Sequence, residues 1–223
     1  MDVQEPPERR FKFNSTDDKA ASELEQFINM IGLDRAAPGR YSFLLAVSLF
    51  GAFKSGLQNP HTVVREIMAL EAGTPTGLKA PIQNRHPPLK GLWHKHYLQD
   101  GLRSMAMNVQ QGLKRYGMPY FQQKIKEAQE TGEERYVTVE DIEALSSDVI
   151  HGNLSRLRAD ERYTGEWLVF ARHEGLNFYL CIATHDKSTH DHIRQLIDNV
   201  CCMEFPFLSK LLADAESETN GLG

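Results

Sequence analysis

The spacing of apolar residues predicts that helices fill most of the N-terminal two-thirds of the chain. Leu24, Phe27, Ile28 and Ile31 recur at helical spacing, which predicts a helix that starts from a cap at Thr16 and ends before Gly32. Further helices are expected at about residues 41–54, where the chain is almost continuously apolar, at 61–72, and at 97–130 with a break near Gly117 and Pro119.

The period of the pattern changes to two near the C-terminus. EWLVFARHEGLNFYLCIATH, residues 166–185, predicts two strands joined by a tight turn at Glu174 and Gly175. A two-residue turn pairs Ala171 with Phe178, Val169 with Leu180 and Trp167 with Ile182. Leu168, Phe170, Tyr179 and Cys181 form the other face. Both faces are apolar, so we expect both to be covered.

Two further helices are indicated by their start signals. Thr138 and Asp141 match a capping box, which predicts a helix that ends at His151-Gly152, where the histidine is read as structural. Ser188 or Thr189 caps a last helix, and its early His190 and His192 are read as surface residues. The expected fold is α+β: a mostly helical N-terminal two-thirds packed on a small antiparallel sheet near the C-terminus, followed by a terminal helix.

We expect one domain over residues 1–223, with flexible ends at 1–14 and 213–223. The Gly/Pro-rich segment 73–88 is expected to be a loop, and a loop of that length is often functional.

Composition is that of a globular protein, with 41% hydrophobic and 25% charged residues among 223. The first ten residues, MDVQEPPERR, lack the apolar core of a secretion signal. The three cysteines form no CxxC pair and are read as apolar packing residues. We therefore expect a cytoplasmic protein without membrane association.

Charge is distributed unevenly, although the whole chain carries only −5. Residues 85–126 hold eight basic residues and one acid, a net +7, whereas residues 127–161 hold ten acids and three arginines, a net −7. The basic segment predicts an anionic partner. Alternatively, the two segments neutralise each other within the fold.

The stretch LKGLWHKHYL, residues 89–98, is the richest in candidate chemistry. On a strand, His94 and His96 would share one face and Lys95 would point away. Such a pair is half of many metal sites and would need a third ligand, such as His86, His185 or an acid. The alternatives are ordinary hydrogen-bonded histidines and a metal-free site.

The metal-free alternative suits RNA cleavage. This reaction needs a base for the 2′-hydroxyl, an acid for the leaving oxygen and a cation for the phosphorane. His94 and His96 are the candidate proton carriers, and Trp93 and Tyr97 the candidate base-stacking surfaces, with core packing as the alternative for Trp93. Four basic residues could bind phosphate: Arg85, Lys90, Lys95 and Arg103.

His185 ends the second predicted strand and is a further catalytic candidate. In the assumed register Glu166 lies opposite Ala183, on the same face as His185, so a Glu–His pair could fix one imidazole tautomer. Arg172 pairs with Asn177 in this register, roughly 26 Å from His185 along the strand, and is therefore excluded from that site.

The hairpin and following helix, TGEWLVFARHEGLNFYLCIATHDKSTHDHIRQLI, resemble in layout the small bacterial ribonuclease toxins grouped around RelE, barnase and the colicin-type tRNases. The resemblance covers about 35 residues and carries over no catalytic residue. It implies an RNA-cleaving toxin or defence protein.

We therefore expect a metal-independent ribonuclease of bacterial toxin or defence type, without a cofactor. Its partners would be RNA or another polyanion, and a neutralising protein. The alternatives are a metal-dependent hydrolase that uses the His-x-His pair, and a non-catalytic protein that binds an acidic partner through the basic segment 85–126.

Overall fold

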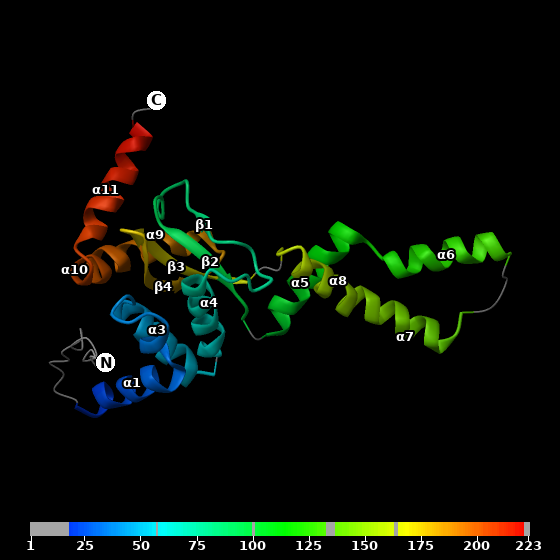
Figure 1. Cartoon of the computed structure of the whole chain (residues 1–223), viewed down its shortest axis with the longest axis horizontal. Helices are drawn as coiled ribbons and strands as arrows, with labels where there is room; N and C mark the ends of the chain where they lie inside the picture. The colour runs from blue at the N-terminus through cyan, green and yellow to red at the C-terminus, as the bar shows by residue number, and fades with distance from the viewer. Residues whose placement is uncertain (1–17, 57, 100, 133–136, 163–164, 221–223) are drawn as a thin grey trace, which may run out of the picture. The chain divides into compact units, whose positions relative to one another are not determined.

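The computed structural model describes residues 18–56, 58–99, 101–132, 137–162 and 165–220 (Figure 1). Contacts divide the chain into two compact units. The sheet unit comprises Met1–Thr76, Ala80–Gln99 and Gly165–Gly223, and the helical unit comprises Gly77–Lys79 and Asp100–Thr164. A single folding domain remains a prediction.

The sheet unit is built around a four-stranded antiparallel sheet. Its order is β1-β2-β3-β4, with β1 at Ile82–Gln83, β2 at Trp93–Tyr97, β3 at Glu166–His173 and β4 at Leu176–Ala183. The α+β prediction is confirmed. The hairpin turn is also confirmed: Glu174 and Gly175 both have positive φ, at 50° and 79°, as turns that match the twist of a hairpin require.

The predicted register is right next to the turn and wrong beyond it. Ala171 pairs with Phe178, but Val169 pairs with Cys181 and not with Leu180. A β-bulge adds one residue to β4 at this point, and an added residue moves all later side chains to the opposite face. Trp167 consequently pairs with Ala183, and Cys181 joins the face of Val169.

The segment around residue 95 is a strand and not the start of a helix. β2 occupies the centre of the sheet, and the helix expected from residue 97 begins at Leu102. β1 lies inside the segment expected to be a loop. Neither short strand has the apolar alternation that marks β3 and β4.

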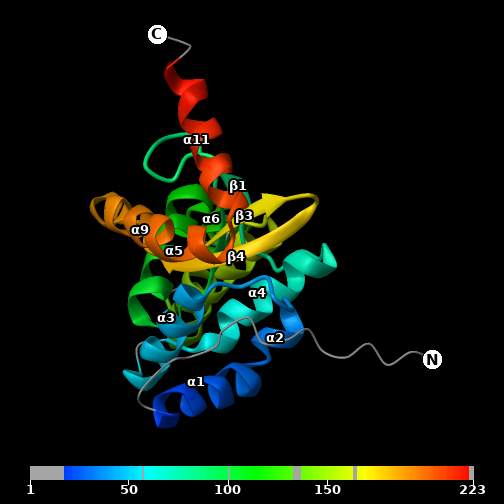
Figure 2. The ribbon, with the colours of Figure 1, turned by 90° about the vertical axis from the view of Figure 1, so that its left-hand side faces the viewer.

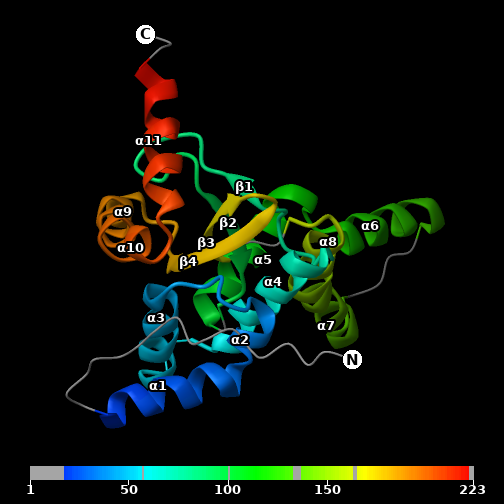
Figure 3. The same cartoon turned by 60° about the vertical axis from the view of Figure 1, so that its left-hand side comes forward.

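Helices cover both faces of the sheet (Figures 2 and 3). Leu168, Phe170 and Tyr179 on one face pack against the N-terminal helices. These are α1 (Asp18–Ile31), α2 (Leu33–Ala36), α3 (Phe43–Lys54) and α4 (Pro60–Ala72). The side chains of Ser42 and Asn59 cap α3 and α4, while Thr16 lies outside the described residues.

The opposite face packs against C-terminal helices. Asp186 caps the short turn η2 (Lys187–Thr189), which leads into α9 (His190–Leu196), so the predicted cap is displaced by two or three residues. The helix continues through η3 (Ile197–Cys201) and α10 (Cys202–Glu204). Cys181 and Cys201 are buried in this core, where burial raises the pKa of both thiols. α11 (Phe207–Asn220) follows, so residues 213–220 are helical.

The helical unit contains α5 (Leu102–Tyr116), α6 (Pro119–Thr131), α7 (Val139–Ser147), η1 (Asp148–Gly152) and α8 (Asn153–Ala159). The break at Gly117 and the capping box of Thr138 with Asp141 are confirmed. The predicted end of this helix at His151-Gly152 is wrong, because the helical segment continues through Gly152 into α8. α5 and α8 lie side by side (Figure 1), where Gly112 permits close approach to Asn153.

Within the described ranges, no helix combines the length and apolarity needed to cross a membrane.

Candidate functional site

Four histidines and one tryptophan form an aromatic cluster on the sheet face that packs against α9–α11, here called the histidine cluster. Strand alternation puts His94 and His96 on the same face, as predicted. His94 stacks on Trp167 with ring centroids 4.1 Å apart, and His96 stacks on His185 at 5.1 Å. His190 lies 5.0 Å from Trp167. The structure therefore brings together three of the predicted proton carriers, His94, His96 and His185.

One backbone carbonyl orients two of these rings. The Gly165 oxygen lies 2.7 Å from His96 Nδ1 and 2.6 Å from His185 Nε2. A carbonyl only accepts hydrogen bonds, so we assign a proton to each of these two nitrogens. The Gly165 backbone N–H also lies near His96 Nδ1, at 3.4 Å, but a protonated Nδ1 cannot accept from it, and the shorter contact with the carbonyl decides the assignment. In neutral His185 the lone pair is then on Nδ1, which can take up a proton.

Position 165 has no room for a side chain and therefore requires glycine. A Cβ there would lie 1.8 Å from the backbone oxygen of Tyr97. This close approach of β2 to the chain before β3 brings the Gly165 carbonyl within reach of both imidazoles.

Glu166 lies next to His185 but does not bond to its ring. Its Oε2 accepts a hydrogen bond of 3.1 Å from the His185 backbone N–H. The role expected of Glu166, holding one tautomer of His185, falls to the Gly165 carbonyl. Glu166 instead fixes the backbone at the end of β4.

Exposure distinguishes the members of the cluster. His94, His96 and His190 are only 6%, 2% and 7% exposed. His185 is exposed, so it forms the solvent side of the cluster. The sequence interpretation of His190 as a surface residue is wrong, whereas His192 is exposed as expected. Proton exchange with a ligand would therefore fall on His185.

Lys95 and Tyr97 lie on the opposite face of the sheet and are buried. Lys95 Nζ lies 3.6 Å from Glu66 Oε2, and these residues are 4% and 0% exposed. The Tyr97 hydroxyl donates to Gln58, and burial raises the pKa of Tyr97. The structure thus separates Lys95 from Arg85 and Lys90 and Tyr97 from solvent.

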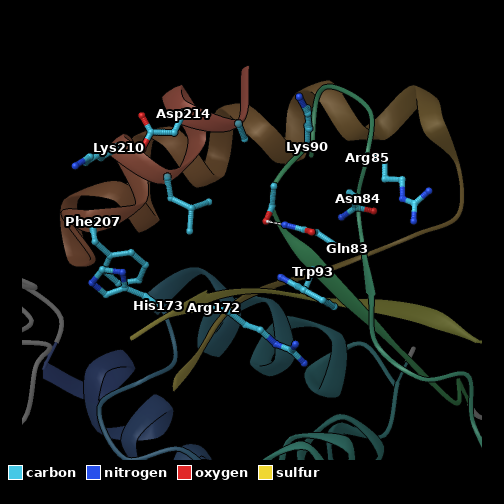
Figure 4. A pocket seen from close by; sticks show the side chains of 13 residues that line it. Gln83, Asn84, Arg85, Lys90, Trp93, Arg172, His173, Phe207, Lys210 and Asp214 are labelled. Atoms are coloured by element: carbon cyan, nitrogen blue, oxygen red, sulfur yellow. Dashed lines mark hydrogen bonds between the residues drawn. The ribbon is translucent and has the colours of Figure 1, made fainter. Parts of the chain in front are cut away.

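A second polar feature, here called the cationic hollow, lies between the β1–β2 connection and α11 (Figure 4). Its volume is about 600 Å³. Cations dominate its charged side chains, with Asp214 as the one acid among the lining residues. The cations are Arg85, Lys90, Arg172 and Lys210.

Aromatic side chains form part of the wall of the hollow. The Arg172 guanidinium lies 3.9 Å from the centroid of Trp93, and His173 stacks on Phe207 at 4.0 Å. Arg85, Lys90 and Trp93 were expected from the sequence to act together, and the structure brings them together here. His173 and Lys210 were missed, and Arg172 had been considered only for the site of His185 and excluded from it.

Asn84 connects the two features. Its Oδ1 lies 2.9 Å from His94 Nδ1, and the same residue lines the cationic hollow. A ligand that displaced Asn84 would therefore act directly on a buried member of the histidine cluster.

The basic segment 85–126 is divided between the two units. Arg103 is in α5 of the helical unit, and its side chain is outside the described residues. In that unit three ion pairs join the two segments: Arg115 lies 3.6 Å from Asp160, Lys124 lies 2.7 Å from Glu127, and Lys126 lies 3.7 Å from Glu130. Part of the +7 and −7 segments is thus neutralised internally, as the alternative interpretation expected.

No three histidine, cysteine or acidic residues in the parts of the chain that the structure describes are arranged to hold a metal ion. The metal-dependent alternative would need such a third ligand beside His94 and His96.

Comparison with known proteins finds no matching family model, and neither the curated proteins nor the solved structures contain a match.

Proposed function

We propose that this chain acts on a phosphodiester as a metal-independent ribonuclease. The observation that carries the proposal is the meeting of His96 and His185 at the Gly165 carbonyl, with the His185 ring exposed to solvent. General acid–base chemistry needs an imidazole of defined tautomer within reach of its substrate. The Gly165 carbonyl supports a defined tautomer for His185, and the exposure of this residue supports access by a ligand.

The reaction would be an internal transesterification. His185 Nδ1 would take the proton of a 2′-hydroxyl, and that oxygen would attack the adjacent phosphorus. The 5′-oxygen would leave with a proton from solvent or a second acid, yielding a 2′,3′-cyclic phosphate and a free 5′-hydroxyl. Because His94 and His96 are buried, their role would be to support His185 and not to contact RNA.

The test is cleavage of a labelled single-stranded RNA by the purified full chain in EDTA. His185→Asn should lower the rate by about 10²- to 10⁴-fold, the usual contribution of a general acid or base. His192→Asn is the matched control, since His192 is exposed on the neighbouring helix α9. A deoxyribose version of the substrate should remain intact.

Burial of His94 and His96 favours a second candidate, a non-catalytic protein that binds RNA or another polyanion. Wild-type protein that binds RNA tightly and leaves it intact would support this candidate and overturn the ribonuclease proposal. Cleavage that EDTA abolishes would instead favour a metal-dependent hydrolase.

A further inference from the structure

We infer that the cationic hollow is a binding site for a single-stranded RNA segment, separate from the histidine cluster. The inference rests on the proposed function for the identity of the ligand. The position of the site and its preference for anions follow from the residues that line it.

The charge of the hollow is opposite to that of the chain. Its four cations and one acid give +3, whereas the whole chain carries −5. Among the residues that the structure describes, no ion pair engages Arg85, Arg172 or Lys210. A local excess of positive charge in a concave wall attracts anions selectively.

The arrangement of the charges indicates an extended ligand. Figure 4 shows Arg85, Lys90 and Lys210 on different sides of the hollow, with their charged ends directed away from one another. A single phosphate could not contact all three. Successive phosphates of one strand could follow such an arrangement, as in other grooves that bind single strands.

Arg172 offers a surface on which a base could stack. One side of its guanidinium is held against Trp93, at 3.9 Å from the ring centroid, and the residue is exposed. Planar guanidinium groups stack on unpaired bases as aromatic rings do. The contact with Trp93 fixes the plane of the guanidinium before the ligand arrives.

Arg172 and the candidate catalytic residue lie at opposite ends of β3. Arg172 is six positions after Glu166, which bonds to the backbone of His185, so the separation is roughly 20 Å along the strand. One nucleotide cannot reach both positions. Arg172 and Trp93 also share the sheet face of Phe170, opposite to the face of the histidine cluster, so a strand of several nucleotides would have to pass round the edge of the sheet to reach His185.

Binding should be measured apart from cleavage. The probe is a fluorescent 2′-O-methyl RNA of about eight nucleotides, within the usual site size for single strands, which lacks the 2′-hydroxyl needed for transesterification. In fluorescence anisotropy, Arg85→Glu with Lys210→Glu should weaken binding at least tenfold. The salt dependence of binding should also fall, by about 0.7 in log–log slope per lost phosphate contact.

Lys126→Glu is the matched control, because Lys126 belongs to the same +7 segment, is 75% exposed and lies in the helical unit. It should leave the affinity unchanged. Native tryptophan fluorescence of each variant verifies folding, since Trp93 and Trp167 both lie in the sheet.

The outcomes separate this inference from the proposed function. If the double variant binds the probe as tightly as the wild type, and the wild type cleaves RNA, the hollow is not the RNA-binding site and the ribonuclease proposal stands. If the double variant binds the probe more weakly, and the wild type does not cleave RNA, the hollow stands as a binding site and the ribonuclease proposal is overturned. Adenosine monophosphate that binds as tightly as the oligonucleotide would overturn the extended-strand ligand, and a wild type without affinity for the probe would overturn the site.

Discussion

Lys95→Met tests whether Lys95 is a structural cation or a ligand for phosphate. Its ammonium lies 3.6 Å from Glu66 in the core, where the two residues are 4% and 0% exposed. Glu66 also accepts a hydrogen bond of 2.6 Å from the Thr76 hydroxyl. Methionine keeps most of the volume of lysine, so the substitution chiefly removes the charge.

The expected loss follows from the burial of Glu66. Removing one partner of a buried ion pair typically costs about 3–5 kcal/mol, because the remaining charge is left in a medium of low polarity. The guanidinium of Arg65 still lies 3.5 Å from Glu66 Oε1, with a side chain that is 57% exposed, so we expect the lower end of that range. A typical domain is stable by about 5–15 kcal/mol, so this loss would be a large fraction of the total. Adding Glu66→Gln should recover most of it, because the amide removes the charge and still accepts from Thr76.

Urea denaturation followed by tryptophan fluorescence is the assay. Both tryptophans lie in β2 and β3, so the signal reports the sheet unit alone. Lys54→Met is the control: Lys54 pairs with Glu23 at the surface, with side chains 57% and 41% exposed, and should cost about 1 kcal/mol or less.

Two results would refute this reasoning. One is a Lys95→Met protein within about 1 kcal/mol of the wild type, well below the loss of about 3–5 kcal/mol that breaking a buried pair should cause. The other is a double variant no more stable than Lys95→Met. A stable Lys95→Met protein that had lost affinity for RNA would restore the phosphate-binding role predicted from the sequence.

Two further predictions concern the sheet unit. Gly165→Ala places a Cβ 1.8 Å from the Tyr97 oxygen and should lower the free energy of unfolding, measured in urea, by at least about 1–3 kcal/mol. Gly51→Ala is the control: its Cβ meets open space, so the free energy of unfolding should rise by up to about 1 kcal/mol. Equal stabilities of the two variants would contradict the close approach at Gly165. Burial raises the pKa of Glu71, but hydrogen bonds, first from Arg40, hold it below the usual 4.5. The stabilisation of the fold by ionised Glu71 is therefore full above pH 4.5 and is lost as the pH falls through the lowered pKa. If the stability of Glu71→Gln falls as steeply with acid as that of the wild type, this contribution of Glu71 is contradicted.

Local signals predicted the N-terminal helices and the hairpin turn, but not α8 or α11. The caps and glycines that end α1 and α4 act within one turn of the chain, and the two-residue turn depends only on Glu174 and Gly175. Such features need no knowledge of distant contacts. They are therefore visible in the sequence.

The sequence did not decide whether residues 93–97 form a strand, because the conformation of β2 depends on a partner strand that is distant in sequence. The sequence WHKHY has polar residues on both faces, and these are buried against Trp167 on one side and Glu66 on the other. Pairing with β3, about 70 residues later, decides the conformation. The alternation of side chains along a strand correctly placed Lys95 on the face opposite to His94 and His96. The sequence did not reveal that Glu66 is the ion-pair partner of Lys95.

The cationic hollow was missed for a similar reason. Arg85, Lys90 and Trp93 are close in sequence and were grouped together, whereas Lys210 reaches them from a helix more than 100 residues later. Arg172 was excluded because it is far from His185. The pairing of Arg172 with Asn177 on which that exclusion rested is confirmed, and the structure places Arg172 in the lining of the cationic hollow.

The bulge in β4 explains how the histidine cluster forms. A regular hairpin would put Glu166 opposite Ala183 and leave His185 beyond the end of β3. The extra residue at Leu180 shifts the register so that Trp167 faces Ala183, and continuing that register puts Gly165 opposite His185. The His185 ring therefore meets the carbonyl that already holds His96. Bulges often re-aim side chains next to active sites, and here the shift joins an exposed imidazole to a buried one that is 89 residues away in sequence.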